Sequence, residues 1–355
     1  MSTKIITTLG PASGNAEVLQ YFKEHSVEIA RLNGSHGNIE EHIRVANLAT
    51  SAGLDLMLDL PGPKIRLGEV HDKLLAVKTG EKVFIEKETE NNNVDNDMKT
   101  LPCQFPIEKF TKVSDIVYVD DGKLQFRVLK VEHNRIQAEA LNSGPVKSHK
   151  GVNLPYGKID IDFLTENDHR LIEKLLPIIK PKYVATSFVK TVNDIYRLKQ
   201  AIHESLGQEK NYYPKIIAKI EMLEAIEPTN LTNLIHECDM IMIARGDLAL
   251  ETTPVHVRVP FIQADIVQRC QQQQKPFIVA TQILESMITC PVPTRAEISD
   301  LYRAVVLDQA NYVMLSGEAA VGQYPKECVT IMHDLIHYTE ITRKPAKSRT
   351  KRKLS

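Results

Sequence analysis

Eight short apolar runs, separated by segments with helical periodicity, constrain the fold of this chain more than any other feature of its sequence. In residues 239–251, DMIMIARGDLALE, the apolar run ends abruptly on a cation, a glycine and a carboxylate. Every run except the third is followed promptly by a predicted helix, and such alternation predicts a parallel sheet. Eight such units in about 260 residues fit a closed (β/α)8 barrel better than an open sheet. The predicted strands cover residues 4–10, 27–35, 54–61, 183–188, 215–221, 238–247, 275–282 and 310–318.

Helical periodicity and capping residues predict the connecting helices. Asn38 with Glu41 and Thr165 with Asp168 have the spacing of helix N-terminal capping boxes. The predicted helices cover 16–25, 38 to about 53, 168–179, a segment from about 192, a segment ending near 236, 260–273, 294–308 and 325–340.

A different pattern interrupts this series after the third strand. Residues 68–149 alternate apolar and polar side chains with a period of two, and Asp121-Gly122 has the sequence of a hairpin turn. We therefore expect an α/β fold, a (β/α)8 TIM barrel with a small all-β domain inserted after strand 3. The predicted division is a barrel of residues 1–66 and 150–342, an inserted β-barrel lid domain of residues 67–149, and a basic disordered tail of residues 343–355.

Charge and cysteine usage limit the classes of partner and compartment. The tail carries seven Lys/Arg and no acidic residue, which leaves 37 basic against 45 acidic residues in the rest of the chain. Such an acidic body argues against nucleic-acid binding, while the tail is either solvated or contacts an anionic partner. No apolar run approaches the roughly 18 residues of a membrane span, and no signal peptide is expected at the N-terminus. Five scattered cysteines without CxxC spacing indicate the cytoplasm, and Cys238 and Cys270 are expected to be packing thiols.

Polar residues gather where the predicted strands end. The carboxyl ends of barrel strands form the active face of this fold, and here they read TLGP, ARLNGS, DLPGP, TSF, AKIE, ARGD, ATQ and LSGE. Alternate residues of a strand share a face, so Lys219 and Glu221 are expected to point together. Lys219 and Glu221 could form only a structural salt bridge, but Glu221 and Asp247 could instead share Mg²⁺, which binds through one or two carboxylates.

Cations and a backbone anion site at the same face indicate a phosphate-binding function. Gly246 allows close approach of a ligand, and a helical turn starting there would present free N–H groups. Cations beside a magnesium-binding carboxylate pair predict phosphoryl transfer by positioning and charge neutralisation. The cations expected to face the barrel mouth are Arg31, Lys64, Arg66, Lys150, Lys219 and Arg245.

The ordered motifs of residues 4–340 resemble those of the pyruvate kinase family. The matching strings are TTLGPAS, IARLNGSHG, LDLPGPKIR, VDDG, HKGVNLP, TSFV, AKIE, ARGDLALE, KPFIVATQILESM, PTRAEISD and MLSGEAAVGQYP. The resemblance implies transfer of a phosphoryl group from phosphoenolpyruvate to ADP, with Mg²⁺ or Mn²⁺ as cofactor. It implies the same architecture as the alternation does, with the inserted domain closing over the nucleotide.

The resemblance also implies a role for individual residues. The metal is expected at Glu221 and Asp247. The implied catalytic residues are Lys219, Arg31, Thr281 and Ser316. The implied substrate-binding residues are Arg245, Gly246, Asp247, Thr281 and Ser187. The implied nucleotide-binding residues are Pro11, His36, Arg66, Asp121 and Lys150. Four of these residues keep a structural alternative, because Thr281 and Ser316 could be caps and His36 and Asp121 could be turn residues.

One departure from the family pattern concerns the monovalent cation. Many members have Asp-Thr-Lys-Gly-Pro-Glu where this chain has Asp59-Leu60-Pro61-Gly62-Pro63-Lys64. Asn33, Ser35 and Asp59 match the K⁺-binding side chains, but a lysine stands in place of the glutamate. The Lys64 ammonium can supply the charge of K⁺, so K⁺ is expected not to be required.

A second departure is the end of the sequence. Most members continue for over a hundred residues into a C-terminal domain with a sugar-phosphate effector site, so control through that domain is expected to be absent, and a homodimer through the barrel is expected. Two alternatives to a kinase stay open: a magnesium-dependent oxo-acid lyase or decarboxylase on the same barrel, and a non-catalytic, kinase-derived regulatory or partner protein.

Overall fold

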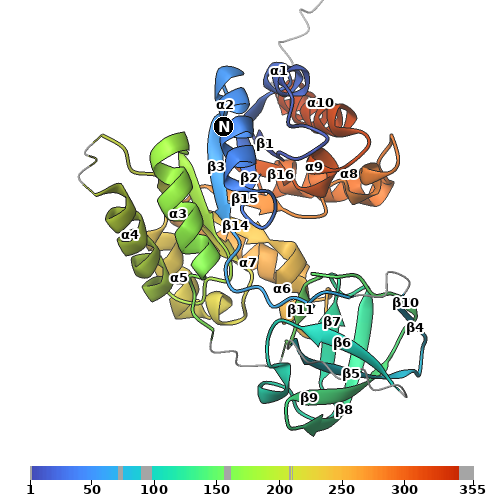
Figure 1. The fold of residues 1–355 in the computed structure, drawn as a ribbon. Coiled ribbons are helices and arrows are strands. Elements are labelled where there is room, and N and C mark those ends of the chain that lie inside the picture. The colour runs from blue at the N-terminus through green and yellow to red at the C-terminus, as the bar shows by residue number, and fades with distance from the viewer. Residues whose placement is uncertain are drawn as a thin grey trace, which may run out of the picture.

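The apolar runs form one closed parallel barrel. The structure is a computed structural model that describes residues 2–70, 75–88, 98–155, 161–207, 209 and 211–343. Within these ranges the barrel strands follow the order β1-β16-β15-β14-β13-β12-β3-β2, and β2 pairs with β1 to close the sheet (Figure 1). The strands are β1 (Lys4–Thr8), β2 (Val27–Asn33), β3 (Asp55–Leu60), β12 (Tyr183–Thr186), β13 (Lys215–Ile220), β14 (Met240–Ala244), β15 (Phe277–Ala280) and β16 (Tyr312–Leu315).

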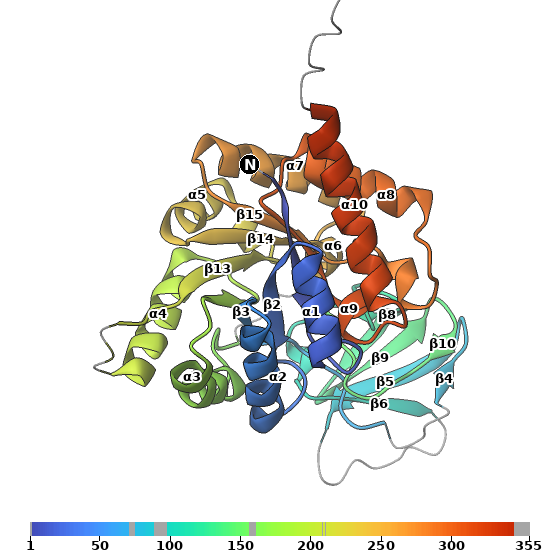
Figure 2. The same cartoon turned by 90° about the horizontal axis from the view of Figure 1, so that it is seen from above.

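Helices cover the outer face of the barrel (Figure 2). The Thr165–Asp168 capping box is present, and Asn38 accepts the backbone N–H of Glu41, so both predicted N-caps are confirmed. The helices around the barrel are α1 (Ala16–Glu24), α2 (Ile39–Ser51), α3 (Glu166–Ile179), α4 (Val192–Leu206), α5 (Pro228–Glu237), α7 (Val259–Gln272), α8 (Arg295–Tyr302) and α10 (Pro325–Arg343). Shorter elements are α6 (Arg245–Glu251), α9 (Gly317–Ala320), η2 (Glu224–Ile226), η3 (Glu285–Ile288) and a π-helical turn, η4 (Arg303–Leu307).

The barrel strands are buried on both faces, which explains why they read as continuous apolar runs. Ile5 packs in the core between strands and helices, whereas its neighbour Ile6 belongs to the cluster inside the barrel. Met57, Met242 and Met314 also fill the barrel interior. With the interior filled by side chains, polar groups are placed at the strand ends.

A second, mainly antiparallel unit lies between β3 and β12 in the sequence and beside one end of the barrel (Figure 1). Its six-stranded sheet has the order β11-β7-β8-β9-β5-β6, and β10 pairs with β4. At the predicted hairpin, Asp121 and Gly122 have φ angles of 57° and 81°, the left-handed geometry that such a turn needs. The elements are β4 (Ala76–Val77), β5 (Lys82–Lys87), β6 (Lys99–Cys103), η1 (Ile107–Lys109), β7 (Ile116–Val119), β8 (Leu124–Glu132), β9 (Arg135–Ala140), β10 (Gly144–Pro145) and β11 (Val152–Asn153).

The predicted fold class is confirmed, and each of the eight predicted apolar runs contains one strand of the barrel. The limits of the division at residues 66/67 and 149/150 stay a prediction, and residues 344–355 of the predicted tail lie outside the described residues. No helix in the described ranges is long and apolar enough to cross a membrane. Cys238 and Cys270 are free and buried, and burial raises the pKa of each thiol to about 12, as expected of packing thiols.

Candidate active site

A cavity of about 560 Å³, which we call the mouth cavity, lies at the carboxyl ends of the barrel strands and faces the inserted unit. Most of the predicted site residues line it, although they come from seven barrel strands or the segments after them and from the inserted unit. These residues are Arg31, Asn33, Ser35, His36, Asp59, Lys64, Arg66, Asp121, Lys150, Ser187, Lys219, Glu221, Asp247, Thr281 and Ser316.

Three predicted site residues do not line this cavity: Pro11, Arg245 and Gly246. The expectation that Arg245 faces the mouth is wrong. Its guanidinium donates to both Asp300 oxygens, at 2.8 and 2.6 Å, and to the Thr281 carbonyl at 2.7 Å. Arg245 begins α6, and its side chain turns outward to α8, so Arg245 ties two barrel elements together.

Lys219 and Glu221 lie side by side at the end of β13, as their spacing predicted. Lys219 Nζ is 3.1 Å from Glu221 Oε1 and donates to Ser187 Oγ at 2.5 Å. The Phe188 N–H donates to Glu221 Oε2 at 2.8 Å. Burial raises the pKa of Glu221, and the nearby Asp247 carboxylate adds to this effect against the opposing Lys219 charge. Burial therefore makes ionisation of Glu221 costly, and the Lys219 ammonium offsets part of that cost.

Asp59 joins the two cations expected to contact a phosphoryl group. Its Oδ2 accepts from Arg31 Nε at 2.7 Å, and its Oδ1 lies 3.3 Å from Lys219 Nζ. Arg31 also donates to Thr8 Oγ1 at 2.8 Å. Burial alone would raise the pKa of Asp59, but Lys219 and Arg31 hold that pKa below its usual range. The buried Asp59 carboxylate therefore fixes Arg31 and Lys219 next to each other despite their like charges.

Lys64 reaches Asp247, a contact that the sequence did not reveal. Lys64 Nζ lies 2.8 Å from Asp247 Oδ1 and 3.1 Å from Oδ2, and 4.0 Å from Oδ1 of Asp121 in the inserted unit. Burial would raise the pKa of Asp247, but the Lys64 ammonium lowers it below its usual range. Among the contacts described for Lys64, none joins it to Asn33, Ser35 or Asp59, the residues matched to the monovalent-cation site.

The donor set of Glu221 and Asp247 fits a hard divalent cation. Glu221 directly follows β13, Asp247 lies in α6 directly after the neighbouring strand β14, and both side chains offer carboxylate oxygens. In the described ranges no cluster of three or more His, Cys, Asp or Glu could hold a metal. Two carboxylates with the remaining positions left to water and substrate are typical of Mg²⁺. In the structure the Lys219 and Lys64 ammonium groups supply the neutralising charge at these carboxylates.

Thr281 has a strained backbone beside the start of α6. Its φ angle is 69°, a left-handed conformation that is a genuine outlier for a β-branched residue. Its hydroxyl accepts the Gly246 N–H at 2.9 Å and donates to the Ala280 carbonyl at 2.6 Å. Such strain is common at functional sites, but the hydroxyl contacts are those of a cap on the first turn of α6, so the binding role of Thr281 stays a prediction.

The inserted unit brings further cations to the cavity. Lys150 Nζ is 3.0 Å from Asp120 Oδ1, and Arg66 donates to the His149 carbonyl at 3.1 Å. Burial, followed by the charges of Arg66, Arg31 and Lys150, lowers the pKa of His36 and so disfavours its charged form.

Sequence reasoning missed two residues of this region. Asp120, which precedes the predicted Asp121 in the VDDG motif, makes the ion pair with Lys150. Asn153, in the HKGVNLP motif, donates from Nδ2 to Asp247 Oδ1 and to Glu251 Oε1, both at 3.3 Å. Both lay in motifs that were noticed, but no chemical signal separated them from ordinary turn residues.

The fold and the mouth cavity together define a (β/α)8-barrel protein with cations and carboxylates gathered at its strand ends. A family model described as "Pyruvate kinase, barrel domain" matches residues 1–329. The chain belongs to the pyruvate kinase family, whose members are phosphotransferases.

Individual relatives agree with the family model. A pyruvate kinase of Corynebacterium glutamicum is 37% identical over 347 residues, covering 95% of this chain and 70% of the relative. A pyruvate kinase of Thermococcus litoralis is 33% identical over 345 residues, with the same coverage of 95% and 70%. The crystal structure of a pyruvate kinase from Cryptosporidium parvum superposes with a TM-score of 0.84 at 33% identity, covering 96% of this chain and 69% of that one. The chain therefore spans about 70% of the length of these relatives.

Proposed function

We propose that this chain transfers the phosphoryl group of phosphoenolpyruvate to ADP, forming pyruvate and ATP, with Mg²⁺ or Mn²⁺ held by Glu221 and Asp247. The proposal rests on one observation: Lys219, Glu221 and Asp247 line one cavity. The same cavity is lined by Arg66 and Lys150, which we call the lid-side cations. A bound divalent cation would neutralise phosphate charge there and polarise the phosphoryl oxygens.

The protein's own groups position the phosphoryl group between donor and acceptor. Arg31 and Lys219, fixed by Asp59, face the group as it leaves the enol oxygen of phosphoenolpyruvate and bonds to a β-phosphate oxygen of ADP. We assign the Gly246 N–H, the Thr281 hydroxyl and Ser187 to the substrate carboxylate, which would replace the hydrogen bond that the Gly246 N–H donates to Thr281 in the free chain. Such preorganised charges act most strongly where a bound substrate displaces water from the cavity.

The inserted unit supplies the nucleotide side of the site. We assign Arg66, Lys150 and Asp121 to the nucleotide from this side, with Pro11 and His36 on the barrel side. After transfer, the methylene carbon of the pyruvate enolate takes up a proton, and Thr281 and Ser316 are the hydroxyl groups available to relay it through water.

K⁺ is not required in this proposal. The Asp59 carboxylate is already neutralised by Arg31 and Lys219, and the Lys64 ammonium adds a fixed positive charge to the same cavity. A monovalent cation would add charge to a site that is already balanced.

We also place the protein in the cytoplasm as a homodimer through the barrel. Val257 and Phe261 support a dimer, because these large apolar side chains are 61% and 76% exposed before and on α7. Phe261→Asp should convert the dimer to a monomer in analytical ultracentrifugation, whereas a wild-type monomer would contradict the proposal.

A coupled assay with phosphoenolpyruvate, ADP and Mg²⁺ tests the activity. ATP formation supports the kinase. Decarboxylation or cleavage of an oxo acid without ATP formation would favour the lyase, and inactivity in both assays would favour a regulatory protein. The lid-side cations favour the kinase, since a lyase has no use for a nucleotide site.

A further inference from the structure

A second cavity, of about 200 Å³, lies where the inserted unit joins the barrel. Its walls include residues 63–65, where the chain leaves the barrel, and residues 152–154, where it returns. We call it the junction cavity. Lys64 and Phe188 line both this cavity and the mouth cavity, so the two lie on opposite sides of a shared wall.

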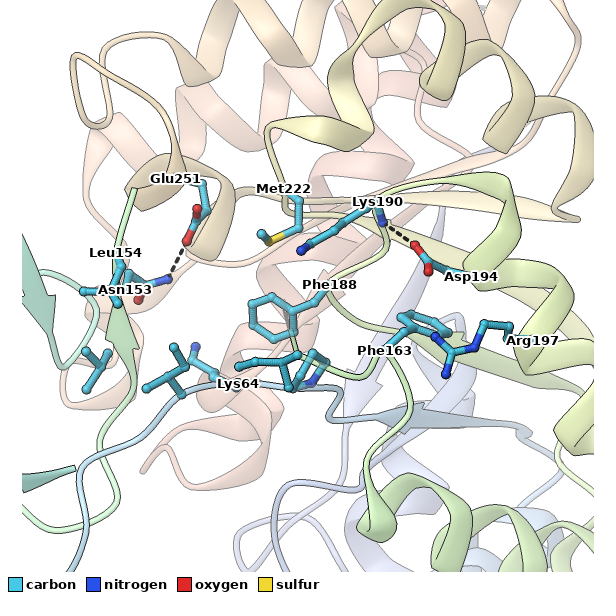
Figure 3. Close-up of a pocket in the computed structure, with 14 residues that line it drawn as sticks. Lys64, Asn153, Leu154, Phe163, Phe188, Lys190, Asp194, Arg197, Met222 and Glu251 are labelled. Atoms are coloured by element: carbon cyan, nitrogen blue, oxygen red, sulfur yellow. Dashed lines mark hydrogen bonds between the residues drawn. The ribbon is translucent and has the colours of Figure 1, made fainter. Parts of the chain in front are cut away.

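Apolar side chains form the centre of the junction cavity, and polar side chains lie toward its ends. Side chains from both units and from the barrel loops form its walls, and Figure 3 shows Phe188, Phe163 and Met222 around its centre. A cavity of about 150 Å³ accommodates a benzene ring. The junction cavity, at about 200 Å³, can therefore hold one aromatic ring with small polar substituents at opposite ends.

Opposite chemistry marks the two ends of the cavity. At one end the Lys190 side chain enters beside Met222 and Phe188, and Arg197 lies next to Phe163 (Figure 3). The carboxylate of Asp194, at the same end, is engaged by the backbone N–H groups of Lys190 and Thr191, each at 2.9 Å. Arg197 is paired with Asp162, so a ligand anion at this end would face Lys190.

The other end contains an unsatisfied acceptor. Asn153 is 4% exposed, its Nδ2 donates to Asp247 and Glu251, and its Oδ1 accepts no hydrogen bond among the described groups. A buried acceptor without a donor is costly, so a ligand hydroxyl that donates to Asn153 Oδ1 would gain affinity.

From this arrangement we propose that the junction cavity is a second binding site, for a small aromatic carboxylate. The ring packs between Phe188, Phe163 and Met222, the carboxylate faces Lys190, and a hydroxyl across the ring faces Asn153. A ligand in this position contacts Lys64 and Phe188. The Lys64 ammonium donates to Asp247, and the Phe188 backbone N–H donates to Glu221.

Three matched probes separate these features. On the full chain without metal or nucleotide, 4-hydroxyphenylacetate should bind with a Kd on the order of 1 mM, as expected for a ligand of this size. Phenylacetate lacks the hydroxyl and should bind about fivefold more weakly, and tyramine, which carries an ammonium in place of the carboxylate, should bind at least about tenfold more weakly. Calorimetry and saturation-transfer NMR measure all three.

Variants locate the site. Ile161 lines the junction cavity, so Ile161→Trp should fill it and abolish binding, and Lys190→Met should weaken 4-hydroxyphenylacetate at least about tenfold. Val113→Trp is the control, because Val113 is exposed and does not line the cavity. The proposal would be overturned if 4-hydroxyphenylacetate bound equally to the wild type and to both cavity variants. It would also be overturned if phosphoenolpyruvate, without metal or nucleotide, displaced the probe competitively.

A consequence for the mouth cavity rests on the proposed function. Because the two cavities share Lys64 and Phe188, saturating 4-hydroxyphenylacetate should change the Mn²⁺ affinity of the chain at least about twofold in an EPR titration. An unchanged Mn²⁺ affinity would contradict coupling between the two cavities. The metal-free binding measurements are independent of catalysis, so an inactive chain that still binds the probe would contradict the kinase and leave the second site in place.

Discussion

Lys64 Nζ contacts both carboxylate oxygens of Asp247, at 2.8 and 3.1 Å. Both oxygens of this proposed metal ligand are therefore already hydrogen-bonded to an ammonium group of the protein. Lys64 therefore neutralises Asp247 in the metal-free chain, and a divalent cation that uses the same oxygens must compete with it.

Removing this competitor should strengthen metal binding. Lys64→Met leaves Glu221 and Asp247 with one fewer neighbouring cation, so Mn²⁺ should bind to the substrate-free chain at least about fivefold more tightly in an EPR titration. Lys123→Met is the matched control, since the Lys123 side chain is 67% exposed on the inserted unit. Weaker Mn²⁺ binding by Lys64→Met would show that Lys64 supports the metal site instead.

Turnover of the wild-type chain should not depend on K⁺. With ionic strength held constant by tetramethylammonium chloride, added KCl should change kcat by less than about twofold, because protein cations already balance Asp59 and Asp247. An activation of tenfold or more would contradict this prediction.

Asp59 should contribute strongly to stability. Asp59→Asn removes a buried carboxylate between Arg31 and Lys219 and leaves two adjacent cations uncompensated, so we expect a loss of about 3–5 kcal/mol in the free energy of unfolding. Asp55→Asn is the control, because Asp55 pairs with Lys182 at the surface and should cost less than about 1 kcal/mol. Urea denaturation distinguishes the two, and equal losses would contradict the assigned role of Asp59.

The eight-strand pattern allowed most of the fold to be predicted. A barrel strand has both faces buried, so its whole length reads as apolar, and the polar residues at its end mark the active face. The pairing of Lys219 with Glu221 followed from the two-residue repeat of a strand. These features depend on local sequence, and the structure agrees with them.

The directions of long side chains could not be predicted in this way. Arg245 pairs with Asp300, and Lys64 with Asp247, across 55 and 183 residues of sequence. The role of Asn153 depends on Asp247 and Glu251, which only the folded chain brings near it. Such contacts are set by tertiary structure, and no motif spacing encodes them.

Glu251 should make stability depend on pH. Burial, with Asp247 and Glu224 adding to it, raises the pKa of Glu251 to about 7, against the partial opposition of Asn153 and Lys190. The folded state therefore holds the proton more tightly than the unfolded state, whose carboxyl has its ordinary pKa of 4.5. The stabilisation is complete below pH 4.5 and is lost as pH rises to about 7, by up to about 3 kcal/mol.

Glu251→Gln tests this pH dependence. Gln cannot ionise, so the decline in unfolding free energy between pH 4.5 and 7 should become shallower in urea titrations of this variant. The same slope in wild type and Glu251→Gln would show that other groups cause the decline.

The most direct test of the proposed phosphoryl transfer is the rate of ATP formation by Lys219→Met, measured beside its binding of phosphoenolpyruvate with Mn²⁺. Lys219 faces the moving phosphoryl group, whereas Glu221 and Asp247 hold the metal. We therefore expect the variant to retain phosphoenolpyruvate binding within about tenfold while its kcat falls at least about 1000-fold. A Lys219→Met variant that forms ATP at close to the wild-type rate would contradict the assignment of this site.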